Sequence, residues 1–346
     1  MPEFSPESVH NPLLEKAPRI LRFDPDAYFP EWQSAVRRTF KQLLGNMPAP
    51  VPLDLQILSE EPRPATPNLP AHTGISFLFT SEPHAQVPCT LLLPAATRQP
   101  PVMICLQGHS TGAHISLGRP KYPGDEKAIE GDRDYGLQAL RQGYAALVLE
   151  QRAFGQRTDA RPNDTKQGYL GCHHSSLVAL LLGRTMAGER VLDVTRAIDL
   201  LTAHFADRID PARIAIMGNS GGGLITYLAA AYDPRIAAAM PSCAICTVRH
   251  SIGTVGHCAD NYIPNFLHYF DTADLAGLIA PRPLIIVAGE TDPLFPLPGV
   301  KECFAEIQQI YKTQSAPEKV QLLIGNGGHR FYADLAWPTL KKLTGW

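Results

Sequence analysis

Ser220, Asp292 and His329 are the residues whose types and order could carry out acyl transfer. A serine hydroxyl is a poor nucleophile until a base removes its proton. His329 is predicted to be that base and then the acid that protonates the leaving group. Asp292 is predicted to fix the histidine tautomer and stabilise the imidazolium. The alternative for Asp292 is a turn residue before Pro293, and the alternative for His329 is a loop histidine between glycines.

Ser220 lies in the motif Gly218-x-Ser220-x-Gly222. A short apolar run at 214–217 predicts a buried strand before it, and the apolar pattern at 224–231 predicts a helix after it. In this setting the serine occupies a sharp strand-to-helix turn whose neighbours must be small. The turn also aims the free N–H groups of the helix N-terminus at the hydroxyl. The alternative is a glycine-rich turn with a bystander serine.

Two carboxylates, Glu290 and Asp292, lie just past the strand predicted at 284–288, so either could serve His329. Asp292 is favoured because Pro293 fixes the local backbone. Its short side chain also loses less rotamer freedom than glutamate when it is held in one geometry.

A developing oxyanion needs donors that are already aimed at it. The backbone N–H of Gly221, directly after the nucleophile, is predicted to be one. The second should come from the loop after the strand predicted at 102–106, with His109 N–H preferred and Gly108 as the alternative. The side chains of His109 and His114 either line the pocket, or lie at the surface or behind the pocket.

The predicted elements indicate an α/β fold with a doubly wound, mostly parallel sheet. Residues 1–50 are expected to form a partly helical extension, with a helix at 30–44, and residues 51–346 the catalytic domain. Antiparallel strands are predicted at one sheet edge, followed by strands and helices that alternate. The predicted strands are 51–58, 74–80, 87–93, 102–106, 144–150, 214–217, 236–240, 284–288 and 320–324, and the helices 134–142, 188–206, 299–313 and 334–343. A proline-rich loop is predicted at 59–70, and a polar loop is predicted to follow 151–157 and run to about 170. A long irregular segment is predicted from 241 to about 272.

The composition excludes several classes of protein. The chain has 346 residues, of which 18% are charged, and a net charge of −2, so neither nucleic acid nor an anionic membrane is an expected partner. No signal-peptide pattern and no bilayer-spanning apolar run is found in the sequence. Seven scattered cysteines favour reduced thiols in a cytoplasmic protein over a disulfide framework.

Four stretches carry a resemblance to a known family: 106–114, 150–157, 218–222, and the pair Gly-Glu-Thr-Asp-Pro with Gly-Gly-His-Arg-Phe. Over residues 75–340 the chain resembles an α/β-hydrolase of the dienelactone hydrolase-like group, close to its acetyl xylan esterase branch. The resemblance implies carboxylic-ester hydrolysis through an acyl-serine intermediate, without a cofactor. The chain departs from the family pattern at Gln107 and Asn219. A serine nucleophile also argues against true dienelactone hydrolases, which use cysteine.

Cys243-x-x-Cys246, with His250, His257 and Cys258 nearby, raises the question of a metal. Zinc prefers four tetrahedral ligands, and a second tight cysteine pair is missing from the sequence, so no metal is expected. The segment 241–272, together with 172–174, is instead predicted to form pocket walls over the nucleophile. Gln107, His173 and His257 are then the candidate substrate contacts.

The favoured function is a serine carboxylesterase that acts on short-chain esters, with acetyl and sugar-borne esters as candidates. Its expected partner is a small-molecule ester, and a homo-oligomer is left open. A serine peptidase of the prolyl-oligopeptidase type is the second hypothesis, although the N-terminal portion is too short for a propeller domain. A non-enzymatic binding protein that kept the fold is the third.

Overall fold

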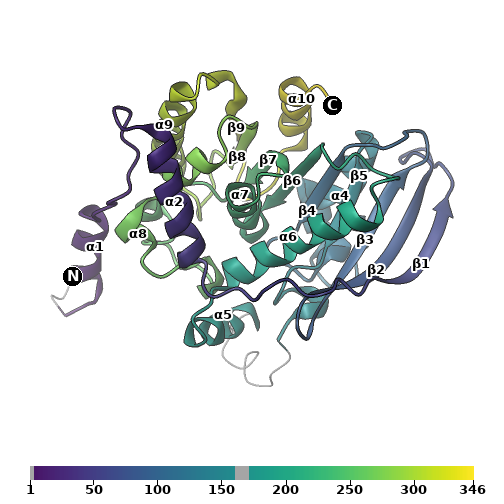
Figure 1. Cartoon of the computed structure of the whole chain (residues 1–346), viewed down its shortest axis with the longest axis horizontal. Coiled ribbons are helices and arrows are strands. Elements are labelled where there is room, and N and C mark those ends of the chain that lie inside the picture. The colour runs from purple at the N-terminus through teal and green to yellow at the C-terminus, as the bar shows by residue number, and fades with distance from the viewer. Residues whose placement is uncertain (1–3, 160–170) are drawn as a thin grey trace.

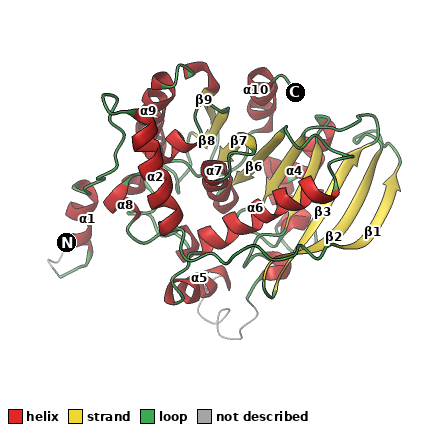
Figure 2. Cartoon of the chain, viewed as in Figure 1, coloured by secondary structure: helices red, strands yellow, loops and turns green. Residues whose placement is uncertain are grey.

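The computed structural model describes residues 4–159 and 171–346, and its core is one mixed β-sheet with helices on both faces (Figures 1 and 2). In the described residues nine strands pair in the order β1-β2-β3-β5-β4-β6-β7-β8-β9. Their bounds are β1 (Gln56–Arg63), β2 (His72–Glu82), β3 (Ala85–Pro94), β4 (Val102–Leu106), β5 (Ala145–Leu149), β6 (Ile214–Asn219), β7 (Ile236–Ser242), β8 (Leu284–Gly289) and β9 (Val320–Gly325).

The strands from β5 to β9 are parallel, whereas β1, β2 and β3 pair antiparallel with their neighbours. Leu106 at the end of β4 lies opposite Leu149 of β5 and Gly218 of β6. The carboxyl ends of these strands therefore meet at one edge of the sheet, which is where ligands bind in open α/β folds. The predicted mostly parallel, doubly wound sheet is confirmed.

Side chains alternate between the two faces of the central strands. Val102, Ile104 and Leu106 of β4 belong to one apolar core, and Met103 and Cys105 to the other. The helices of the described residues are α1 (Glu7–Glu15), α2 (Phe29–Leu43), α3 (Asp125–Ala128), α4 (Tyr135–Arg141), α5 (Gly171–Leu181), α6 (Met186–His204), α7 (Gly221–Tyr232), α8 (Phe266–Tyr269), α9 (Leu297–Thr313) and α10 (Ala333–Thr344). Helices α2, α6, α7 and α9 pack on the first core, and α4 and α10 on the second. None of the helices in these two described ranges is long and apolar enough to cross a bilayer.

Helix α2 confirms the helix predicted near the N-terminus and shows what its apolar positions do. Trp32, Val36 and Phe40 recur at helical spacing, and all three are buried in the core that also holds the sheet. The Trp32 indole N–H donates to the carbonyl of Leu21 (2.9 Å), which fixes the chain before the helix. In Figure 1 this purple helix crosses the same side of the molecule as α7 and α9.

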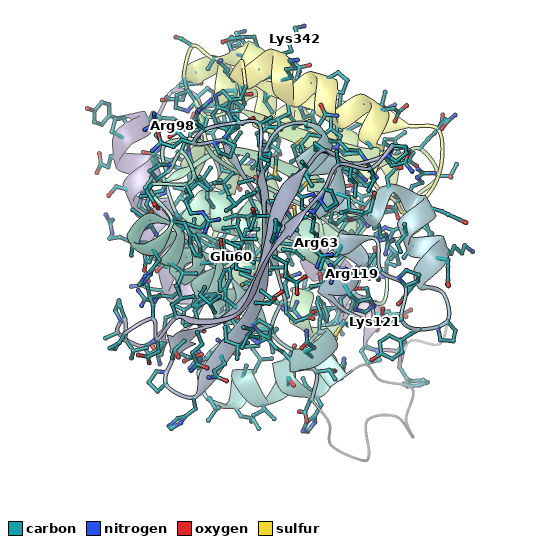
Figure 3. All side chains as sticks on the ribbon, turned by 90° about the vertical axis from the view of Figure 1, so that its right-hand side faces the viewer. Glu60, Arg63, Arg98, Arg119, Lys121 and Lys342 are labelled. Carbon is teal, nitrogen blue, oxygen red and sulfur yellow. The ribbon has the colours of Figure 1, made fainter. Side chains whose placement is uncertain are left out.

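The first strand is where the sequence prediction was wrong. A strand was expected at 51–58 and a loop at 59–70, but β1 runs from Gln56 to Arg63 and includes Pro62. This strand is exposed along most of its length, so ladder pairing with the long β2 decides its bounds, and burial does not. Proline and charged side chains are typical of an edge strand, where they discourage pairing with another chain. Figure 3 shows Glu60 and Arg63 on this edge.

The stretch 150–157 supplies a buried ionic network that joins three elements. Asp193 of α6 is fully buried and accepts hydrogen bonds from Arg152 (2.7 Å), Arg157 (2.7 Å) and the Ser81 hydroxyl of β2 (2.6 Å). Arg152 also pairs with Glu82 of β2. The loop after β5 is thereby fixed to both α6 and β2. The polar loop predicted to run to about 170 lies outside the described residues over 160–170.

We predict that Asp193→Asn lowers the free energy of unfolding by about 3 kcal/mol, because it leaves two partly buried guanidinium groups without their shared, fully buried carboxylate. Urea denaturation measures this. The matched control is Glu60→Gln, which breaks the exposed pair with Arg208 (2.9 Å) and should cost less than about 1 kcal/mol. Equal losses for both variants would contradict a structural role for the network.

The stability that Asp193 contributes should depend on pH. Burial raises the pKa of Asp193, but the two arginines outweigh it and hold the pKa at about 2. Because this is below the unfolded value of about 3.9, the stabilisation is complete above that pH and is lost as the pH falls towards the folded value. The difference in unfolding free energy between the wild type and Asp193→Asn should therefore shrink between roughly pH 4 and pH 2.

Candidate active site

Ser220 stands at the turn between β6 and α7 in a backbone conformation that non-glycine residues rarely adopt, with φ 58° and ψ −126°. Such strain persists only where the surroundings over-determine it, and it concentrates at functional sites. The Ser220 N–H donates to the carbonyl of Ser242 at the end of β7 (2.9 Å). The first residue of α7 is Gly221, so the helix N-terminus begins directly after the hydroxyl. The strand–turn–helix geometry predicted for this motif is confirmed.

The glycines around Ser220 are required by close backbone approaches. A Cβ on Gly218 would lie 2.6 Å from the carbonyl oxygen of Leu106, and one on Gly222 would collide with the same oxygen. A Cβ on Gly223 would collide with the carbonyl of Ser242. The turn therefore packs closely between the ends of β4 and β7, and a side chain at any of these three glycines would displace it.

Asp292 and His329 form a pair at the carboxyl ends of β8 and β9. His329 Nδ1 lies 2.8 Å from Asp292 Oδ2, and Asp292 is buried, whereas the competing carboxylate of Glu290 is exposed. The backbone N–H of Leu294 donates to the other carboxylate oxygen of Asp292 (2.9 Å). Burial raises the pKa of Asp292, but the neighbouring His329 and this N–H outweigh it and keep the pKa below its ordinary value. Asp292 is thus held as a carboxylate beside the imidazole.

The loops that carry the serine and the histidine are both tied to the end of β7. The Ser242 hydroxyl donates to Asn219 Oδ1 (2.8 Å), next to the serine. The thiol of Cys243 donates to the carbonyl of Arg330 (3.2 Å), next to the histidine. On the far side, the Thr291 N–H donates to the carbonyl of Gly327 (3.0 Å), which joins the Asp292 loop to the His329 loop.

The loop after β4 passes directly against the serine turn, as predicted for an oxyanion site. A Cβ on Gly108 would lie 2.9 Å from Ser220 Cβ and 3.2 Å from the nitrogen of Gly221. The imidazole of His109 follows, with Nδ1 3.3 Å from the position that a Cβ on Gly221 would take. Gly108, His109 and Gly221 are therefore neighbours, and only glycine allows the two backbones to come so close.

His109 is held in a charged and aromatic setting that the sequence did not reveal. Its Nε2 lies 3.1 Å from Asp260 Oδ2, and its ring packs edge-on against Phe154 with centroids 4.9 Å apart. Arg190 lies over the Phe154 ring, with Cζ 4.0 Å from the ring centroid, and pairs with Asp260 (2.8 Å). Burial lowers the pKa of His109, but Asp260 and Cys258 raise it to a net value of about 9.

Gln107 and Glu150 hold the loop after β4 in place. The Gln107 amide nitrogen donates to the Ser116 hydroxyl (2.6 Å) and to the carbonyl of Arg133 (2.8 Å). Glu150 accepts from the N–H of Ala113 (3.0 Å). Gln107 is only 2% exposed, and this burial argues against the predicted contact between Gln107 and substrate.

The other predicted histidines lie in different places. His257 lies beside the pair of Asp292 and His329: its ring is 5.3 Å from Phe295, which in turn stacks on His329 at 5.9 Å. Burial and the charges of nearby histidines lower its pKa, so it is neutral at pH 7. His173 lies on α5, where its Nδ1 accepts from the N–H of Ala259 (3.4 Å). His114 is bound to Asp125 (2.8 Å), which favours the position behind the pocket that was one of the two predicted for it.

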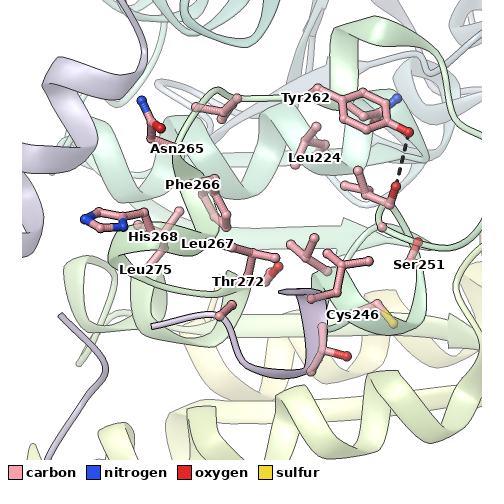
Figure 4. Close-up of a pocket in the computed structure, with 18 of the residues that line it drawn as sticks. Leu224, Cys246, Ser251, Tyr262, Asn265, Phe266, Leu267, His268, Thr272 and Leu275 are labelled. Atoms are coloured by element: carbon pink, nitrogen blue, oxygen red, sulfur yellow. Dashed lines mark hydrogen bonds between the residues drawn. The ribbon is translucent and has the colours of Figure 1, made fainter. Parts of the chain in front are cut away.

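A cavity of about 710 Å³ has Phe295 among its lining residues. Figure 4 gives a close-up of this cavity. Its walls come from α1, α7, α8 and the irregular segment before α8, and most of the side chains that line it are apolar. Leu224, one turn into α7 from Ser220, and Tyr262 are among them. The predicted segment 241–272 lines this cavity, but neither 172–174 nor Ser220 is among its lining residues, and sequence reasoning missed α1 and Phe295. A lone phenylalanine in a loop gives no periodic signal.

The two cysteines that raised the question of zinc do not belong to one converging group of potential ligands in the described residues. Cys246 is not among the groups of potential ligands that converge in the described ranges, whereas Cys243 lies near Asp292 and His329. Both carboxylate and imidazole there already bind each other, as a triad requires.

The nine-stranded sheet, the strained serine turn and the Asp292–His329 pair together define an α/β-hydrolase. The chain belongs to the Abhydrolase family, whose sequence model matches residues 4–326.

Individual relatives agree with this class. The chain is 25% identical over 320 residues to the Bacillus subtilis (strain 168) protein named "Putative hydrolase YtaP", covering 90% of this chain and 98% of that protein. It is similar in structure to a putative acetyl xylan esterase from Bacteroides fragilis, with a TM-score of 0.74 at 18% identity, covering 93% and 82% of the two chains. A glucuronoyl esterase from Solibacter usitatus gives a TM-score of 0.67 at 17% identity, covering 95% and 96%. At 18% and 17% identity, the likeness of this chain to these two structures shows a common fold alone.

The contact between the Asp292 and His329 loops depends on Gly289, whose hypothetical Cβ would collide with the carbonyl of Gly328. We predict that Gly289→Ala lowers the free energy of unfolding by about 1–3 kcal/mol, through overpacking. Gly256→Ala is the matched control, because a Cβ there meets no atom of the described residues within 4 Å and φ is ordinary. The control should change stability by less than about 0.5 kcal/mol in urea denaturation. A neutral Gly289 variant would mean that the two loops are free to separate.

Proposed function

We propose that the protein is a serine carboxylesterase in which Ser220 is the nucleophile, His329 the base and Asp292 the residue that orients the base. The observation that carries the proposal is the buried Asp292, 2.8 Å from His329 Nδ1, at the same sheet edge as a strained serine turn. An imidazole bound through Nδ1 to a carboxylate keeps the tautomer in which Nε2 accepts a proton.

The reaction then proceeds in two halves. Ser220 Oγ attacks the ester carbonyl carbon while His329 Nε2 takes its proton, and the tetrahedral intermediate collapses as that proton passes to the departing alcohol oxygen. Water repeats the sequence on the acyl-serine: His329 takes a proton from water, the hydroxide attacks, and the acid leaves as Ser220 regains its hydrogen. No bound group beyond the chain and water is needed for these steps.

The developing negative charge on the carbonyl oxygen needs backbone donors. The N–H of Gly221 is the first, since it opens α7 directly after the nucleophile. The N–H of His109 is the second, with Gly108 as the alternative, and the closeness of this loop to the serine turn supports both.

The proposed substrate is a small ester. The structural relatives named above are an acetyl xylan esterase and a glucuronoyl esterase by their names, which supports an ester carried on a sugar. The cavity beside Phe295 offers an apolar surface for the other side of the ester bond. Short-chain esters, acetyl esters among them, are therefore the first candidates, and a cytoplasmic location fits small esters better than polymeric xylan.

The peptidase and binding-protein hypotheses make different predictions. A peptidase would cleave amides in a panel of paired esters and amides, whereas an esterase would cleave the esters alone. A binding protein would not react with a fluorophosphonate, which labels only an activated serine. Oligomeric state stays a prediction.

We predict that Ser220→Ala lowers turnover of a short-chain p-nitrophenyl ester by on the order of 10⁶, because the acyl-enzyme can no longer form. Fluorophosphonate labelling should disappear in the same variant, while its thermal melting stays close to that of the wild type. Substantial turnover in a folded Ser220→Ala protein would remove this serine from its role.

Asp292→Asn should lower turnover by roughly 10⁴, because an amide at this position favours the wrong histidine tautomer. The control is Glu290→Gln on the same loop, where loss of an exposed charge should change turnover less than about tenfold. Both variants are measured on one ester at one pH. A crippled Glu290 variant beside an active Asp292 variant would transfer the role to Glu290.

A further inference from the structure

Four side chains that can bind a metal converge behind the loop after β4. They are His109 of that loop, Cys172 of α5, and Cys258 and Asp260 from the segment before α8. Their ligand atoms all lie within 4.8 Å of one another. Imidazole, two thiols and a carboxylate form a donor set that zinc binds tetrahedrally in proteins.

The distances and burial fit one ion. The Cys172 and Cys258 sulfurs are 3.1 Å apart, and His109 Nε2 is 3.1 Å from Asp260 Oδ2. Zinc bonds of about 2.0–2.3 Å place tetrahedral ligand atoms roughly 3.3–3.8 Å apart, so small shifts would admit the ion. Cys172 is 1% and Asp260 2% exposed, which would shield it from water.

His109 Nε2 is the second observation that points to a ligand. This nitrogen is buried, and it makes no hydrogen bond of ordinary geometry to any residue that the structure describes, although Asp260 is close. A buried polar nitrogen without such a bond is costly. A metal ion among the four groups would displace the proton that Nε2 carries beside Asp260 and bind the lone pair that this frees.

The surroundings of the cluster complete the electrostatic balance. Arg190 is almost fully buried and donates to Asp260 (2.8 Å), and the Asn261 amide donates to the other oxygen of Asp260 (2.8 Å). Two thiolates and one carboxylate carry three negative charges, which Zn²⁺ and Arg190 together neutralise. Outer partners of this kind orient a ligand and are typical of built metal sites.

We propose that His109, Cys172, Cys258 and Asp260 bind a zinc ion that positions the loop beside the serine turn. An ion on Nε2 leaves the proton of His109 on Nδ1, the nitrogen that faces Gly221. It also ties α5 and the 258–260 segment to that loop, although the three lie far apart in the sequence. The ion thus has a positioning role and takes no part in the proton transfers proposed for His329.

The competing occupant of the same space is a Cys172–Cys258 disulfide. The sulfurs are farther apart than the roughly 2.05 Å of an S–S bond. A disulfide would also not explain why His109 and Asp260 lie beside the two sulfurs. We therefore favour the metal, and the experiment separates the two.

The test is metal binding by the full-length protein, measured without any substrate. After dialysis against a chelator and a reductant, titration with Co²⁺ should give the charge-transfer and visible bands of a tetrahedral thiolate site, and Zn²⁺ should displace the cobalt in one equivalent. Zn²⁺ should also raise Tm by roughly 3 °C or more at saturating concentration. Cys172→Ser and Cys258→Ser should each abolish the thiolate bands.

Cys246→Ser is the matched control, because it removes a buried thiol outside the converging ligand groups of the described residues and should leave cobalt binding unchanged. No cobalt bands in the folded wild type would overturn the proposal. So would a thiol count, in denaturant without reductant, that is two short of the seven cysteines, since that result assigns the pair to a disulfide. Fluorophosphonate labelling of Ser220 is read separately, so failure of the esterase proposal would not be mistaken for failure of the metal site.

Discussion

The backbone of Ser220 is the constraint on which the rest of the site depends. A residue with a side chain at φ 58° and ψ −126° costs on the order of 1–3 kcal/mol, so the surrounding structure must hold it there. Two backbone hydrogen bonds do so, one to Ser242 and one from Leu224 (2.9 Å). The missing side chains at Gly218 and Gly222 let β4 close over the turn. The glycines of the motif are therefore needed for the fit between strands more than for flexibility.

The same closeness makes the loop after β4 part of the site, and that loop is held by charges placed well behind it. Glu150 fixes the loop through Ala113, and Arg152, two residues later, anchors its own segment to Asp193. Breaking a buried pair of this kind is costly because it leaves a charge without its partner. The stretch 150–157 therefore supports the loop after β4, which carries the proposed oxyanion donors.

The sequence was sufficient for features that arise from local patterns. Short apolar runs separated by helical patterns located most strands of the sheet, and the order of Ser220, Asp292 and His329 placed three groups at one edge. Local patterns failed at β1, where ladder pairing with β2 extends an exposed strand through Pro62. They failed again for Asp260, which pairs with Arg190 at a separation of 70 residues. No spacing rule reports a contact between side chains of unrelated segments, so the sequence pointed to Cys243 and Cys246, whereas the converging cysteines are Cys172 and Cys258.

His109, His257 and His329 have different partners, and these partners separate the roles of the three imidazoles. His257 meets the Ser251 hydroxyl (3.1 Å), and its buried position lowers its pKa, so it adds no charge to the site at pH 7. His109 faces Asp260 through Nε2, which leaves Nδ1 on the side of Gly221. Only His329, among these three, presents Nδ1 to a buried carboxylate and so keeps Nε2 to exchange a proton. A site assigns its acid and its base through environments that push the pKa values of neighbouring titratable groups apart. The partner of each ring therefore supports His329 as the proposed base.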